Sequence, residues 1–186
     1  ARTLARAVLD ADRRYVPGFG ALLVYRLDRY LRGGDHAPFV QRGYPAVRFT
    51  EMNEDWRHQH QDVRVEKGVQ YGDLPQFVDY DYLARVARVN AAVVASLAAA
   101  PAPPQNALLK ADLSPVTTLS WGSVPGAAAY EILWRPTNAP DWTGSKRVEN
   151  AETITLPLSK DDYLFAVRSV SAGGARSLPS LPSPMP

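Results

Sequence analysis

A polar stretch about a third of the way along the chain, His-Gln-His-Gln-Asp at residues 58–62, carries the residue types best suited to chemistry. Two of the three histidines, His58 and His60, lie here beside the carboxylate of Asp62. Imidazole is the commonest protein ligand for zinc and an acid–base group near neutral pH. The stretch therefore indicates a metal site or, on spacing alone, a solvated loop whose histidines only titrate.

The elements before this cluster should decide where it lies. Residues 46–51 form the most strand-like run in the first half of the chain, and a polar loop containing Trp56 joins them to the cluster. Residues 20–27 form a short apolar run that suits a strand buried on both faces. Ligands of open α/β sheets bind beyond the carboxyl ends of strands. We therefore expect a mixed α/β sheet with His58 just past the end of one strand.

A turn with paired glycines, Gly33 and Gly34, precedes Asp35 and His36. Glycine permits backbone angles closed to other residues, so such a turn can aim the next side chains sharply. Asp35 could cap a short helix over residues 37–42, or it could line a pocket together with His36. The residue types leave both roles open.

Helical periodicity appears twice in the first half. Residues 3–12 predict an amphipathic surface helix whose charges form a solvated face, ended by Pro17 and Gly18. Residues 69–78 read as a loop with aromatic anchors at Tyr71 and Phe77. The clearest helix follows, capped by Asp79 or Asp81, and its apolar stripe predicts a core-packing face at Tyr82, Val86, Val89 and Val93.

The proline-rich segment 101–104 ends that helix and changes the character of the sequence. Four later runs alternate between apolar and polar residues, which favours a small antiparallel β-sandwich; they are residues 116–121, 129–135, 153–156 and 163–170. We therefore predict an α/β first domain at 1–100, a linker at 101–104, an all-β domain at 105–181 and a tail at 182–186.

Composition narrows the function classes. The chain has 186 residues, 46% of them hydrophobic, and a net charge of +2, which is too small to imply a nucleic-acid partner. It has no cysteine, so any metal must be held by His, Asp or Glu. No apolar run reaches the ~18 residues that a membrane span needs. The chain begins at Ala1 without a leader, so we expect an export signal to have been removed or to lie outside this sequence.

Three segments in order resemble the C-terminal part of the catalytic domain of the M28 family of zinc metallopeptidases, of the bacterial leucyl-aminopeptidase type. They are residues 32–39, which end in Gly-Asp-His-Ala-Pro-Phe, the strand-like residues 43–51, and residues 58–62. The family has Ser-Asp-His-x-x-Phe-like and His-Thr-x-x-Asp-like segments at these places. Gly34 and Gln59 replace the usual serine and threonine, and neither change removes a metal-binding atom.

The resemblance implies a zinc-dependent aminopeptidase with two zinc ions, peptide substrates and a secreted or periplasmic location. It makes His58 a zinc ligand, places Asp35 and His36 near the substrate pocket, and leaves His60 and Asp62 for the second shell of the metal. The family's other zinc ligands and its general base belong to sequence upstream of the matching region. We therefore expect this chain to be inactive without that upstream segment.

The second half resembles a fibronectin type III domain, with Trp121 as the inner core tryptophan and Tyr163 at the corner before the last long strands. It contains no histidine, and its carboxylates are scattered, so no catalytic role is expected there. Trp134 or Trp142 could mark a protein or glycan contact, although packing at an edge strand is the favoured role.

Three alternatives to an aminopeptidase stay open. A glutaminyl-cyclase-like zinc acyltransferase would use the same fold with a single zinc ion. A non-catalytic binding module would act through its fibronectin-like half, and a stable breakdown fragment would have no function at all.

Overall fold

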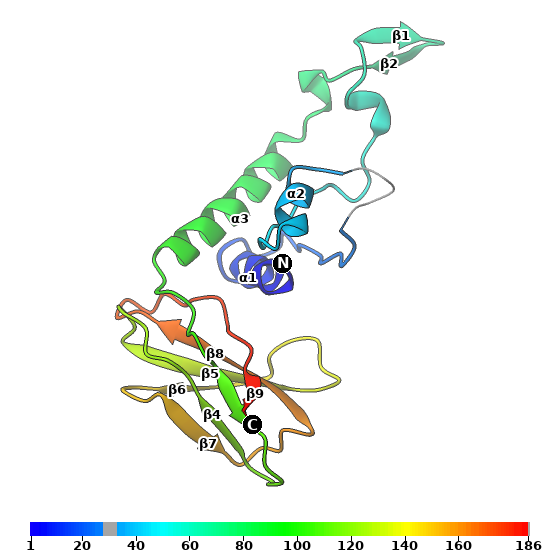
Figure 1. Cartoon of the computed structure of the whole chain (residues 1–186). Helices are drawn as coiled ribbons and strands as arrows, with labels where there is room; N and C mark the ends of the chain where they lie inside the picture. The colour runs from blue at the N-terminus through cyan, green and yellow to red at the C-terminus, as the bar shows by residue number, and fades with distance from the viewer. Residues whose placement is uncertain (28–32, 186) are drawn as a thin grey trace. The chain divides into compact units, whose positions relative to one another are not determined.

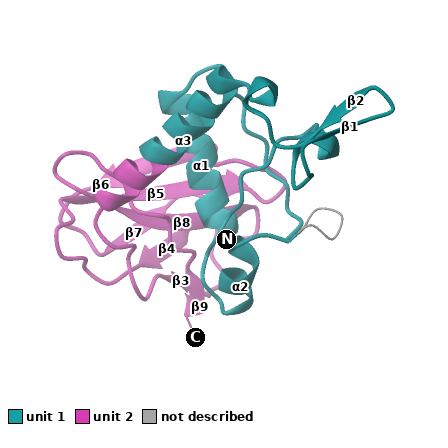
Figure 2. Ribbon diagram, turned by 90° about the horizontal axis from the view of Figure 1, so that it is seen from above, with its two compact units in different colours: residues 1–92 teal, residues 93–186 magenta. Residues whose placement is uncertain are grey.

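The structure is a computed structural model of the chain that describes residues 1–27 and 33–185 (Figure 1). It divides into two compact units, Ala1–Ala92 and Val93–Pro186 (Figure 2). The described residues of the first unit form helices and one hairpin, and the second unit is a β-sandwich. This confirms the predicted fold class of a mixed helix-and-sheet part followed by an all-β part.

The first predicted helix forms as α1, Arg2–Tyr15, and buries Val8 and Ala11. Contrary to the prediction, not all of its charged side chains are solvated. Asp12 lies on the buried face of the helix and is only 3% exposed. The Oδ2 atom of Asp12 accepts a hydrogen bond of 2.8 Å from the backbone N–H of Ala21. This carboxylate therefore ties the helix to the segment that follows the turn.

The two strands predicted at residues 20–27 and 46–51 do not form, and both segments lack regular secondary structure. A strand exists only when its backbone is paired with a neighbouring strand. In the part of the first unit that the structure describes, the only sheet is the hairpin of β1, Arg64–Glu66, and β2, Val69–Tyr71. These two segments thus have the apolar pattern of strands but are not paired with a neighbouring strand among the described residues.

The hairpin was not expected, since residues 69–78 were predicted to be a loop. Lys67 and Gly68 join its strands with positive φ angles of 50° and 79°, the backbone that a tight two-residue hairpin turn requires. A short 3₁₀ helix, η2, Pro75–Phe77, follows after Gly72. Strands of three residues are too short for a period-two pattern to be recognised.

The clearest predicted helix forms as α3, Tyr80–Ala98, and ends before the prolines at 101–104. Asp79 rather than Asp81 provides the cap, because its Oδ1 accepts a 2.9 Å hydrogen bond from the N–H of Tyr82. Only Val89 and Val93 of the predicted stripe are buried, whereas Tyr82 is 39% exposed. The division between the two units falls inside this helix, between Ala92 and Val93.

The second unit is a sandwich of two sheets. A four-stranded sheet has the order β7-β4-β3-β9, and a three-stranded sheet has the order β6-β5-β8. The strands are β3 Leu108–Lys110, β4 Thr117–Ser120, β5 Ala129–Pro136, β6 Gly144–Val148, β7 Thr153–Leu156, β8 Tyr163–Val170 and β9 Ser183–Met185. β9 arises from residues predicted to be a tail, because it pairs in parallel with β3.

Side chains from both sheets fill the core of the sandwich, among them the fully buried Leu119, Ile132 and Val167. Trp121 is 4% exposed in this core, as predicted. Tyr163 packs against the edge of the same cluster. Alternation predicted four of its strands, β4, β5, β7 and β8, whereas β3, β6 and β9 were not predicted.

Candidate metal and substrate site

His58 is the last residue of η1, Trp56–His58, a 3₁₀ turn that follows the coil segment 46–51. Asp55 caps this turn, because its Oδ1 accepts a 3.1 Å hydrogen bond from the N–H of Arg57. The base of the hairpin closes onto the turn through a 2.9 Å hydrogen bond from the N–H of Gly72 to the carbonyl oxygen of Arg57. Local and non-local bonds together fix the backbone on which His58 is mounted.

Gly72 is needed at that contact. Its φ is +110°, and a Cβ atom there would lie 2.7 Å from the Cα of Val63. A side chain at this position would therefore collide with the backbone of Val63 at the base of the hairpin.

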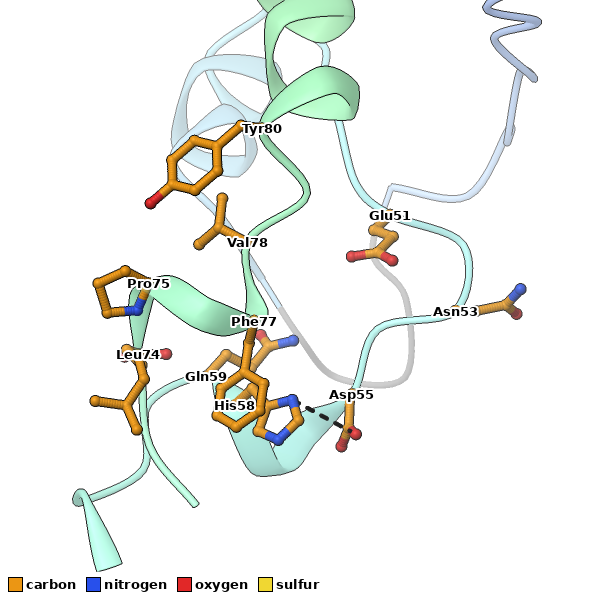
Figure 3. A pocket seen from close by; sticks show the side chains of 11 residues that line it. Glu51, Asn53, Asp55, His58, Gln59, Leu74, Pro75, Phe77, Val78 and Tyr80 are labelled. Atoms are coloured by element: carbon orange, nitrogen blue, oxygen red, sulfur yellow. Dashed lines mark ion pairs between the residues drawn. The ribbon is translucent and has the colours of Figure 1, made fainter. Parts of the chain in front are cut away.

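Two neighbours hold the imidazole of His58 (Figure 3). The ring of Phe77 stacks on it with centroids 3.5 Å apart and planes at 8°. The Oδ2 atom of Asp55 lies 3.6 Å from its Nδ1 atom. A carboxylate behind one ring nitrogen favours a proton on that nitrogen and leaves the other nitrogen as the lone-pair donor. The arrangement therefore presents Nε2 of His58 as the atom able to bind a metal.

Asp55 stays negatively charged in this site. Its carboxylate is paired with the guanidinium of Arg57, with 2.8 Å between Nε and Oδ1 and 2.6 Å between Nη2 and Oδ2. These hydrogen bonds lower the pKa of Asp55 to about 2. The carboxylate is thus ionised over the whole range in which a histidine changes its charge.

His58 and Asp55 line a pocket of about 460 Å³. Its lining includes two more carboxylates, Glu51 and Asp73. The other lining residues are Asn53, Gln59, Leu74, Pro75, Phe77, Val78 and Tyr80. Figure 3 shows Glu51 and Asp55 across from Leu74, Pro75 and Val78, so the lining is acidic in one part and apolar in another.

The structure separates the other members of the histidine cluster from His58. His60 has the left-handed φ of 53° and is exposed, and its backbone N–H donates to Asp73 Oδ2 at 3.3 Å. Asp62 is exposed, and its carbonyl oxygen accepts a 3.3 Å hydrogen bond from Nη1 of Arg64. The carboxylate that faces the His58 ring is that of Asp55, and the second-shell roles of His60 and Asp62 stay predictions.

Asp35 and His36 lie outside the pocket that contains His58. Asp35 occupies the N-cap position of α2, His36–Gln41, but its side chain makes no capping hydrogen bond. Nε2 of His36 lies 2.7 Å from the carbonyl oxygen of Leu27. Their assignment to a substrate pocket stays a prediction that this structure does not support by proximity.

The described residues fit part of a zinc site. None of the groupings of His, Asp and Glu in the described part of the chain brings three side chains close enough to hold a metal ion. A zinc site needs three or four protein ligands. The geometry around His58 fits one ligand with its supporting carboxylate, so the remaining ligands would have to come from elsewhere.

Sequence reasoning missed Asp55 and Phe77. The signal for Asp55 was available, since a spacing of three residues places two side chains on the same side of a helical turn. No such signal existed for Phe77, because it reaches His58 from η2 through the path of the hairpin.

Trp134 packs against the core of the sandwich, and Trp142 contacts Arg135. The ring of Trp134 lies where a Cβ atom on Gly144 of the neighbouring strand β6 would be. The guanidinium of Arg135 lies 5.6 Å from the centre of the Trp142 ring. Both rings are half-buried, in keeping with the packing role that we favoured.

The curated relatives of this chain include fungal proteins named as probable zinc metalloproteases. One from Leptosphaeria maculans is 46% identical over 99% of this chain and 43% of its own length. One from Pyricularia oryzae is 47% identical over 99% of this chain and 38% of its own length. The chain thus spans about two fifths of the length of these relatives, and the match includes both of its units.

No protein-family model matches the chain. Among solved structures, a Fn3-like protein from Clostridium thermocellum covers 47% of this chain with 23% identity and a TM-score of 0.39. A fibronectin domain of human collagen XX also covers 47%, with 25% identity and a TM-score of 0.35. In the described residues, no helix combines the length and hydrophobicity that crossing a membrane requires.

Proposed function

We propose that this chain is part of a zinc-dependent peptidase and that it supplies one metal ligand, Nε2 of His58. The observation that carries the proposal is the arrangement of the imidazole, stacked on Phe77 with Asp55 facing Nδ1 at 3.6 Å. An imidazole oriented by a carboxylate in this way is typical of zinc ligands. The names of the fungal relatives support the same class of activity.

When bound, zinc would supply an activated water and polarise the peptide carbonyl. The residues of this chain hold and orient the imidazole of His58. Asp55 keeps a proton on Nδ1 of His58, and Phe77 restricts rotation of the ring. The apolar wall of the pocket, with Leu74, Pro75 and Val78, suits an apolar side chain of a peptide substrate.

The carboxylates in the pocket lining support an exopeptidase that acts at the amino end of a peptide. Glu51 and Asp73 add negative charge to a pocket whose Asp55 is already paired with Arg57. Carboxylates favour a positively charged group nearby, and the free amino terminus of a peptide is such a group. We therefore propose an aminopeptidase of the M28 type, exported from the cell as the resemblance implies.

The test uses a hybrid in which this chain replaces the matched region of the Leptosphaeria maculans relative. The hybrid should release amino-terminal residues from short peptides, and a chelator should abolish this release. The chain alone should show no release, because one imidazole cannot hold a catalytic zinc ion. A folded hybrid that binds zinc but leaves peptides intact would contradict the proposal.

A further inference from the structure

The first unit has little core and a large exposed apolar surface. The buried apolar residues among its described residues are Val8, Ala11, Val16 and Val89. Most exposed large apolar side chains that the structure describes also belong to this unit, and the few in the second unit are Val94, Leu113, Leu164 and Leu181. A unit of this length normally buries far more apolar surface, because its stability depends on that burial.

Part of that exposed surface is a segment with the properties of a strand but no pairing. Leu22, Val24 and Tyr25 are 73%, 66% and 58% exposed, and Leu23 between them is half-covered. No backbone–backbone hydrogen bond joins residues 22–25 to any described residue. Apolar side chains beside unpaired backbone groups form an edge on which another strand can add.

A second segment has the same character. Ala46, Val47 and Phe49 are half-covered, and no backbone–backbone hydrogen bond joins these three to another described residue. Tyr44, just before them, is 64% exposed. Both segments are those whose sequences predict strands, so the missing component is the partner backbone and not the strand-forming pattern.

We infer that residues 22–25 and 45–49 are docking edges for the remainder of a peptidase polypeptide, equivalent to the part of the fungal relatives that this chain does not match. Residues 22–25 and 45–49 become paired strands when that polypeptide supplies neighbouring strands. The chain matches 43% or less of the length of the relatives from Leptosphaeria and Pyricularia. The unmatched part of those proteins is therefore long enough to cover residues 22–25 and 45–49. The inference rests on the proposed function for the identity of the occupant.

The experiment measures amide hydrogen exchange at residues 22–25 in the chain alone, in the hybrid described above, and at the matched residues of the whole Leptosphaeria relative. We expect fast exchange in the chain and exchange slowed by about 100-fold or more in the other two proteins, because paired strands open rarely. Equally fast exchange in all three would overturn the inference. Slow exchange in a self-associated chain would assign the edges to a second copy and would also overturn it.

A charge substitution separates docking from general destabilisation. Val24→Lys should lower the melting temperature of the hybrid but leave that of the chain alone unchanged, because Val24 is 66% exposed here. Leu181→Lys is the matched control at the same exposure of 66% in the second unit, and it should be silent in both proteins. If Val24→Lys were silent in the hybrid, these residues would not be an interface. Neither hydrogen exchange nor the melting temperature depends on zinc or substrate. The docking inference can therefore be tested even if the proposed peptidase activity is not found.

Discussion

The imidazole of His58 is held by two neighbours that act differently. Phe77 covers one face of the ring, and aromatic stacking of this kind contributes ~0.5–1.5 kcal/mol beyond burial. Asp55 acts on the proton, since its carboxylate faces Nδ1 and is kept ionised by Arg57. Orientation and tautomer are therefore set by separate residues, and each can be tested without removing the imidazole.

Asp55→Asn in the hybrid protein should weaken zinc binding by about 10–100-fold, the usual cost of losing a carboxylate behind a metal-bound histidine. Asp62→Asn is the matched control, because that side chain is exposed and lies outside the pocket. Competition with a chelator of known affinity measures both. If Asp62→Asn weakened binding and Asp55→Asn did not, the assignment of the supporting carboxylate would be wrong.

Among the elements of the second unit, strands β5 and β8 are joined by a pair of opposite charges. Glu131 lies directly across from Arg168, and its Oε2 is 2.7 Å from Nη2 of Arg168 and 3.1 Å from Nε of Arg176. Partial burial pulls the pKa of Glu131 up, but the hydrogen bond and charge of Arg168, together with the charge of Arg176, outweigh it. The pKa of Glu131 is therefore lowered from its ordinary value of 4.5.

A lowered pKa stabilises the folded state only while the carboxylate is ionised. The contribution of Glu131 should be fully present above pH ~4.5 and should be lost as the pH falls through the lower folded-state pKa. Glu131→Gln should therefore reduce the melting temperature at pH 7 and have a smaller effect near pH 3. Glu149→Gln, at an exposed pair with Arg147, should change little at either pH. A pH-independent effect of Glu131→Gln would assign its role to packing alone.

The elements differ in how far the sequence determines them. Helix α3 and the strands β4, β5, β7 and β8 of the sandwich could be predicted because their periodicity and their partners lie inside the chain, whereas β3, β6 and β9 were not predicted. Residues 20–27 and 46–51 carry equally clear patterns, yet a strand is a property of two segments, and their partners are not among the described residues. The short hairpin β1–β2 went unnoticed for the opposite reason, since its pairing is strong and its pattern brief.

The candidate site shows the same limit. His58 was predicted from residue type, spacing and family resemblance, and the structure places it in an acidic and apolar pocket. The resemblance implied only a second-shell role for Asp62, together with His60. In the structure Asp62 is exposed just before the hairpin, and the carboxylate next to the His58 ring is that of Asp55, which a 3₁₀ turn brings there.

At the scale of the whole molecule, the two units should differ in their ability to fold alone. Residues 100–186 contain a complete two-sheet core, and hydrogen bonds from Ser169 Oγ to the Ala102 oxygen and from Ser180 Oγ to the Pro104 oxygen, both 2.6 Å, attach the proline segment to it. This fragment should give a dispersed amide NMR spectrum. Residues 1–98 should give a collapsed, poorly dispersed one, because their buried apolar residues are few. The reverse result would contradict the division of stability between the units.

The assignment of His58 as the metal ligand is tested most directly by comparing two substitutions in the hybrid protein, His58→Ala and His60→Ala, for zinc content and peptide hydrolysis. Loss of a zinc ligand should remove essentially all turnover, with no rescue by excess zinc, whereas loss of an exposed neighbour should leave both properties measurable. We predict the first outcome for His58 and the second for His60. Full zinc content and activity in His58→Ala, with loss of both in His60→Ala, would contradict the account and move the ligand by two residues.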